Sequence, residues 1–161
     1  MSKTEPPIEK SSRHAKITGD FGEALVLYRL SKYRFECACV DHTGIDLIAH
    51  NPHTQEVMGI SVKTRCRLPG QAEQFVRITQ EHIKKMEDAC QAFHCVAYLA
   101  IVVEADEIIR CFLLSLQHFQ ALVSRGDTTS GWKMSPRHLK LYAADPEIKT
   151  WELHTTTGRW W

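Results

Sequence analysis

Two charged residues interrupt apolar segments in the stretch GIDLIAHNPHTQEVMGISVKTR, which covers residues 44–65. Asp46 lies within GIDLIA, and Lys63 follows GISV. Aspartate is uncommon in strands and an unpaired buried charge is costly, so Asp46 requires a partner. The carboxylate and the ammonium can form a structural ion pair on a half-exposed sheet, or they can belong to a functional site. Their spacing in the sequence is compatible with both interpretations.

The alternation of side chains along a strand predicts that these two charges share one side of a sheet. The sequence predicts one strand over residues 44–50 and another over 56–64, joined by the turn-forming residues NPHT. Successive side chains point to opposite faces, so Asp46 lies on one face of the first strand, and Ser61 and Lys63 share a face of the second. If the strands pair across the turn, all three polar side chains lie on the same side. The other face is apolar and is expected to consist of Ile45, Leu47, Ala49, Met58, Ile60 and Val62.

These two strands belong to a longer predicted alternation of helices and strands. The first helix is expected to run from Thr18, its candidate N-cap, to about Tyr33. Thr79 and Ser115 are the candidate N-caps of two later helices. Those helices are expected over 80–93 and from 116 to near Gly126, and a short helix is expected over 137–144. The other strands are expected over 35–40, 95–104, 108–114 and 149–154. This order predicts an α/β fold in which helices cover a mixed β-sheet.

Length and composition indicate one globular domain. The 161 residues are enough for a single core, and 43% hydrophobic with 24% charged residues is an ordinary globular composition. Residues 1–16 are polar and are expected to form a flexible lead-in to a single domain over 17–161, with a core over 17–114 and a C-terminal extension over 115–161. The net charge of +1 excludes a strong overall attraction to nucleic acids or membranes, so nucleic-acid binding would require a local patch.

No segment of the sequence indicates a membrane protein or a secreted one. The N-terminal residues MSKTEPPIEKSSRHAK lack the apolar core of a signal peptide, and the apolar run VAYLAIVV is too short to span a bilayer. The six cysteines include no CxxC pair, so buried thiols are expected rather than a zinc or disulfide site. We therefore expect a cytoplasmic protein that does not bind membranes.

The stretch around Asp46 and Lys63 resembles the PD-(D/E)xK nuclease superfamily, and within it the archaeal Holliday-junction-resolvase-like proteins and small restriction-endonuclease-like proteins. An aspartate in a G-x-D-[LI]-[IV]-A strand, followed by a strand that ends in V-x-V-K or E-x-K, is the pattern that is similar. GDFGEALVLYRLSKYRFEC resembles the first helix of that group, and ITQEHIKKMEDACQAFHCVAYLAIVVE resembles its later helix–strand unit. The likeness covers residues 17–104 and implies a restriction-endonuclease-like fold, with a central mixed β-sheet flanked by helices and an α-β-β-β-α-β core.

The resemblance also implies a role for each matched position. Glu23 matches the glutamate of the first helix, Asp46 matches the metal-binding aspartate, and Lys63 matches the lysine that positions or activates the attacking water. The backbone carbonyl of Val62 matches a further metal ligand. The implied activity is that of a metal-dependent endonuclease that hydrolyses DNA phosphodiester bonds with Mg²⁺ or Mn²⁺. The implied partners are branched or double-stranded DNA and a second copy of the chain, with no small-molecule cofactor.

Ser61 departs from the family pattern, which has Glu, Asp or Gln at that position. A serine hydroxyl is a weak neutral ligand and would remove one negative charge from a metal site. Glu23 can serve as the second carboxylate, helped by Asp20 or by Asp41. Alternatively, the protein is a catalytically inactive module that binds nucleic acid or acts as a scaffold. A third alternative keeps Asp46 as a structural ion-pair partner in an unrelated α/β domain.

Two features outside the motif suggest contacts to nucleic acid. Arg65 and Arg67 follow Lys63 and are candidates for contacts to a phosphate backbone, although the same residues are typical of a solvated loop. Trp160 and Trp161 can stack on bases, or they can close a core or a dimer contact.

Overall fold

The computed structural model describes residues 8–123 and 129–156. A six-stranded sheet with the strand order β1-β2-β3-β5-β6-β8 forms its centre, and β4 and β7 form a separate two-stranded sheet. The strands are β1 (Glu36–Cys39), β2 (Leu47–His50), β3 (Val57–Cys66), β4 (Val76–Thr79), β5 (Val96–Ala105), β6 (Ile108–Ser115), β7 (Thr129–Trp132) and β8 (Lys149–His154). The helices are α1 (His14–Lys32), α2 (Gln80–Ala92), α3 (Leu116–Leu122) and α4 (Pro136–Ala144).

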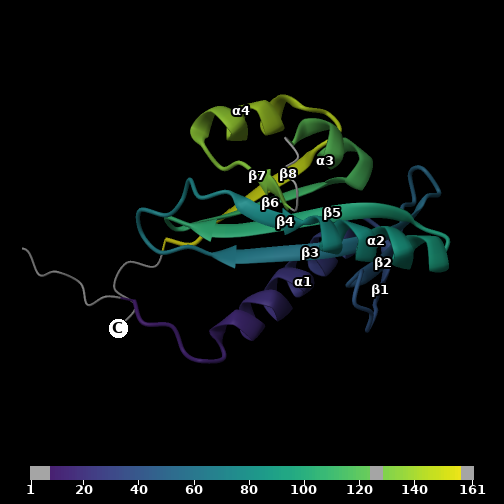
Figure 1. The fold of residues 1–161 in the computed structure, drawn as a ribbon, viewed down its shortest axis with the longest axis horizontal. Coiled ribbons are helices and arrows are strands. Elements are labelled where there is room, and N and C mark those ends of the chain that lie inside the picture. Colours follow the sequence, from purple (N-terminus) through teal and green to yellow (C-terminus); the bar gives the residue numbers. More distant parts are fainter. Residues whose placement is uncertain (1–7, 124–128, 157–161) are drawn as a thin grey trace, which may run out of the picture.

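The central sheet is mixed, as the sequence predicts. β3 and β5 run parallel, joined by a crossover that contains β4 and α2, whereas the other neighbouring strands of the sheet run antiparallel. Helices lie on both faces: in Figure 1, α1 lies below the sheet and α3 and α4 lie above it. None of the helices in the described part of the chain combines the length and the apolar character that a bilayer-spanning segment needs.

Each face of the sheet has its own apolar core. On one face, Val26 and Leu30 of α1 pack with Leu47, Ile60 and Val62 of the β2–β3 pair. On the opposite face, the core is built from α2, α3, α4, the small sheet and the strands, and its fully buried members include Trp132, Phe119, Ile78, Met86, Leu99, Ile101 and Leu114. The expected apolar face of β2 and β3 is therefore the surface that receives α1.

Two of the three predicted N-caps are confirmed by the structure, and the third is wrong. The hydroxyl groups of Thr79 and Ser115 accept hydrogen bonds of 3.1 Å from the backbone N–H of residues 82 and 118, which confirms both N-caps. Thr18 is not an N-cap, because α1 already begins at His14. Its hydroxyl instead donates a hydrogen bond of 2.7 Å to the His14 carbonyl one turn earlier, which is the bond that a threonine makes inside a helix.

Several boundaries and two strands differ from the prediction. The strands β4 and β7 were not expected, because each has four residues and its partner lies far away in the sequence. β2 begins at Leu47 rather than at residue 44, so alternation does not extend back to Ile45, which packs with Ala89 and Cys90 near α2. The helix α3 ends at Leu122, before the predicted end near Gly126. The predicted contacts of Trp160 and Trp161 lie outside the described residues.

Candidate functional site

Asp46 lies where the pairing of β2 and β3 ends. Its backbone N–H donates a hydrogen bond of 2.8 Å to the Ile60 carbonyl, and its carboxylate Oδ2 accepts one of 2.6 Å from the Val62 N–H. Leu47, which pairs with Ile60, is the first residue of β2 in the ladder with β3, so Asp46 lies just before the paired segment. From this point β3 continues to Cys66 along β5 without β2 on its other edge. The carboxylate of Asp46 is therefore fixed at the point where the sheet opens.

The segment before Asp46 is held against α2. A Cβ atom at Gly44 would overlap the Lys85 carbonyl and would lie 2.9 Å from the Cβ of Ala89, so only glycine permits this approach. The next residue, Ile45, is fully buried beside Ala89. This close packing fixes the backbone that leads into Asp46.

Lys63 lies two residues beyond Ser61 on β3 and is largely withdrawn from solvent. Burial lowers the pKa of Lys63, and the neighbouring charge of Arg65 lowers it further, whereas Asp46 and Glu23 act in the opposite direction. The ammonium is therefore close enough to both carboxylates to feel their charges.

Glu23 reaches this region from α1. The preceding residue, Gly22, packs directly on Thr64 of β3, because a Cβ atom at Gly22 would overlap the Thr64 hydroxyl. Burial raises the pKa of Glu23, and repulsion from Asp46 and then Asp20 raises it further, while Lys63 lowers it. The charges of Glu23, Asp46 and Lys63 thus act on one another, although 40 residues of sequence separate the first from the last.

The carboxylate oxygens of Glu23 and Asp46 and the carbonyl oxygen of Val62 are of the type that binds a hard divalent cation. Two carboxylates that repel each other would be relieved by a positive charge between them, and carboxylate and carbonyl oxygens are the ligands that Mg²⁺ and Mn²⁺ accept. The N–H of Val62 points to the open edge of β3, and the carbonyl of a strand residue points to the same side as its N–H. The Val62 carbonyl therefore faces the edge where Asp46 lies.

Ser61 is 2% exposed and is the only polar residue in the buried class among the described residues. Of the acids considered as its replacement, Asp20 forms an ion pair of 2.9 Å with Lys16 on the surface of α1, and Asp41 is exposed in the segment between β1 and β2. Glu23 is the carboxylate whose pKa responds directly to Asp46.

His82 is a further residue of this region that the sequence analysis did not single out. It lies in the first turn of α2, next to the cap formed by Thr79. Burial lowers the pKa of His82, Lys63 lowers it further, and Asp46 opposes both effects. The pattern of α2 offered a signal: residue 82 precedes Met86 and Ala89 at helical spacing, so it is expected at the border of the buried stripe, where the structure places it as a half-buried residue.

Arg65 and Arg67 continue from the same end of β3. Arg65 donates a hydrogen bond of 2.8 Å to the Thr64 carbonyl. Arg67 donates to the Gln74 side chain at 3.3 Å and to the Phe75 carbonyl at 3.1 Å, so it joins β3 to the segment that leads into β4. Both arginines line a groove with Arg77.

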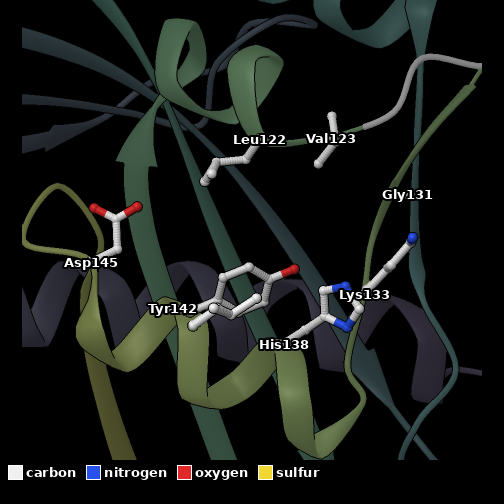
Figure 2. Close-up of a pocket in the computed structure, with 8 residues that line it drawn as sticks. Leu122, Val123, Gly131, Lys133, His138, Tyr142 and Asp145 are labelled. Atoms are coloured by element: carbon white, nitrogen blue, oxygen red, sulfur yellow. The ribbon is translucent and has the colours of Figure 1, made fainter.

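Other polar clusters lie apart from these residues. A cavity of about 300 Å³ lies beside α4. In Figure 2, His138 and Tyr142 of α4 line one side of it, and Leu122 and Val123 line the other. Asp145 also lines this cavity and forms a cluster with His118 and Glu147, in which the His118 Nε2 lies 2.7 Å from the Asp145 Oδ2. The hydrogen bond from His118 lowers the pKa of Asp145. None of these residues belongs to the sheet edge at Asp46.

No protein-family model matches the chain, and no curated protein matches its sequence. The fold is similar to the 1.6 Å structure of Hjc, a Holliday junction resolvase from the archaeal hyperthermophile Archaeoglobus fulgidus. The TM-score is 0.55 at 17% sequence identity, and the match covers 76% of this chain and 88% of that chain. At this identity the likeness concerns the fold alone, a mixed sheet flanked by helices, which agrees with the α/β class that the sequence predicted.

Proposed function

We propose that this protein is a metal-dependent nuclease that hydrolyses DNA phosphodiester bonds. The observation that carries the proposal is the mutual electrostatic influence of Glu23, Asp46 and Lys63 at the edge where β2 stops and β3 continues. Two acids and a lysine at such an edge match the motif positions of the nuclease superfamily. The fold similarity to a Holliday junction resolvase supports DNA as the substrate class.

Each residue has a chemical task in this proposal. Glu23, Asp46 and the Val62 carbonyl would hold Mg²⁺ or Mn²⁺, which when bound supplies positive charge to the scissile phosphate and lowers the pKa of water. Lys63 places its ammonium beside the phosphate and stabilises the charge that develops on the phosphate oxygens. The lowered pKa of Lys63 also makes it easier for its Nζ to exchange a proton with the attacking water.

The second candidate function is a binding or scaffolding module without catalysis, and the specific observation in its favour is Ser61. A buried serine stands where the motif has a carboxylate or an amide, so the site has one charge fewer. A nuclease and an inactive nucleic-acid-binding module make different predictions about cleavage and the same prediction about DNA binding, whereas a scaffold predicts neither.

A cleavage assay separates these two functions. Purified protein is incubated with supercoiled plasmid, single-stranded DNA and a four-way DNA junction, with Mg²⁺, with Mn²⁺ or with EDTA. We expect cleavage that requires the metal and that falls at least about 100-fold in Lys63→Met. Lys84→Met is the matched control, because Lys84 is exposed on α2 and paired with Asp88. Metal-independent cleavage, or equal cleavage by Lys63→Met and wild type, would refute the proposed active site, and DNA binding without cleavage would establish the second function.

A further inference from the structure

A groove with a volume of about 410 Å³ lies where β3 ends and β4 begins. It is lined by Arg65, Arg67, Gln74, Phe75 and Arg77, so three of the five residues are cationic and none is acidic. The chain as a whole carries a net charge of only +1. The groove is therefore a local concentration of positive charge on a nearly neutral protein.

The positive charges of the groove are not neutralised by the rest of the described chain. No carboxylate of the described residues forms an ion pair with Arg65, Arg67 or Arg77. Burial lowers the pKa of Arg67, and the charge of Arg65 lowers it further, so two cations are held together against their repulsion. The Nε atom of Arg67 is buried without a hydrogen-bond partner. A polyanionic ligand would neutralise the charges of these arginines.

The groove also presents an aromatic ring in a fixed position. Phe75 is 50% exposed, and its ring lies over Gly131 of β7, where an added Cβ atom would be 3.1 Å from the ring carbon Cδ2. Arg67 holds the backbone carbonyl of Phe75 through a hydrogen bond of 3.1 Å. One side of the ring is supported by backbone, and the remainder is open to solvent.

The aromatic ring and the cations are aligned with the candidate active site. Lys63 and Arg65 lie on the same face of β3, about 7 Å apart along the strand, and Arg67 follows directly after the last residue of β3. In β4 the side chains at 76 and 78 are buried, so Phe75 and Arg77 project from the opposite face. The groove therefore extends the line of positive charge that begins at Lys63.

We propose that this groove binds an unpaired strand of nucleic acid adjacent to the candidate cleavage site, with Arg65 and Arg77 on successive phosphates and a base stacked on Phe75. In a duplex the faces of the bases are covered by their neighbours, whereas an unpaired base offers its face to an aromatic side chain. The location beside Lys63 makes this a substrate-binding element of the proposed nuclease. The assignment rests on the proposed function for the identity of the substrate.

Binding measured without metal tests the groove independently of catalysis. Fluorescence anisotropy in EDTA compares the full chain with its variants, using a labelled oligothymidylate and a blunt duplex of equal length as probes. We expect Phe75→Ala and Arg77→Ala each to weaken oligothymidylate binding about tenfold. Phe75→Ala should leave duplex binding unchanged, and Phe75→Trp should retain oligothymidylate binding because it keeps the stacking surface. Arg77→Ala should also reduce the slope of log affinity against log salt concentration by about 0.7.

Two exposed residues outside the groove provide matched controls. Phe93 is 47% exposed at the end of α2, and Arg137 is exposed in the first turn of α4, so Phe93→Ala and Arg137→Ala should bind both probes like wild type. Three results would overturn the proposed role of the groove. They are an equal loss of oligothymidylate affinity in the control variants, no loss of it in Phe75→Ala, or equal losses of duplex and oligothymidylate affinity in Phe75→Ala. Loss of cleavage in Lys63→Met with intact oligothymidylate binding supports the groove, whereas an inactive wild type that still binds through Phe75 refutes only the nuclease function.

Discussion

The carboxylate of Asp46 accepts a hydrogen bond of 2.6 Å from the backbone N–H of Val62. This side-chain bond takes the place of the backbone bond that β2 would supply to β3 if it extended further. It satisfies a strand N–H at the open edge and, at the same time, fixes the direction of the carboxylate. One contact thus links the stability of the sheet edge to the geometry of the candidate metal site.

Substitutions at Asp46 should separate its structural contribution from its charge. Asparagine can still accept the hydrogen bond from Val62, so Asp46→Asn should keep most of the free energy of unfolding, whereas Asp46→Ala should lose about 2 kcal/mol. Both variants should lose metal-dependent cleavage by at least about 100-fold, since neither retains the negative charge. Urea denaturation and plasmid cleavage measure the two quantities, with Asp88→Asn on the surface of α2 as the control. A fully active Asp46→Asn would contradict a metal-binding role.

Glu23→Gln should stabilise the metal-free protein and weaken metal binding. The pKa of Glu23 is raised by burial and by its anionic neighbours, so its ionised form is less favourable in the folded state than in the unfolded state. The contribution of this group to stability is therefore fully present below its ordinary pKa of 4.5 and is lost as the pH rises through the higher folded value.

The thermal melting temperature as a function of pH checks this sign. We expect Glu23→Gln to melt above wild type at neutral pH without metal, and the difference to disappear below about pH 4.5. With saturating Mg²⁺ the order should reverse, because wild type binds the ion more tightly. A variant that is less stable than wild type at neutral pH in EDTA would show that Glu23 is not under repulsion from Asp46.

Ser61→Glu should introduce a third carboxylate between Ile60 and Val62, the two residues of β3 whose backbone bonds to Asp46. Because Ser61 is 2% exposed, the new charge would be buried and should lower the melting temperature in EDTA. Mg²⁺ or Mn²⁺ should restore the melting temperature, and isothermal titration calorimetry should detect tighter metal binding by Ser61→Glu than by wild type. Ser61→Gln is the neutral control of similar length. Equal metal affinity in Ser61→Glu and Ser61→Gln would place residue 61 outside the metal site.

Gly22→Ala should destabilise the protein and reduce its activity together. An added Cβ atom would overlap the Thr64 hydroxyl, so α1 must move away from β3, and Glu23 moves with it. We expect a loss of about 1–3 kcal/mol in the free energy of unfolding. Gly19→Ala in the same helix is the matched control: nothing lies within 4 Å of its added Cβ atom, so it should stabilise α1 by about 0.5–1 kcal/mol. Equal effects of the two substitutions would show that the contact between Gly22 and Thr64 is not tight.

The sequence predicted the elements whose signals are local. Side-chain alternation correctly predicted the apolar face formed by Met58, Ile60 and Val62 of β3, and the hydroxyl groups at Thr79 and Ser115 predicted two helix starts. These features depend on residues that are neighbours in the chain. The prediction at Thr18 was wrong because a threonine hydroxyl can also bond to a carbonyl within a helix, and the sequence does not distinguish the two cases.

The amino-acid sequence by itself determined the mixed α/β class of the fold and the pairing of β2 with β3, because turn residues and period-two alternation act over short distances. Only the tertiary structure decided which acid approaches Asp46 and Lys63, and where the arginine side chains form a positively charged groove. The packing of Gly22 on Thr64 brings Glu23 to the sheet edge, and the short strands β4 and β7 bring Phe75 and Arg77 beside Arg65. Burial, close backbone approach and repulsion between like charges depend on distances that arise only when remote segments pack together.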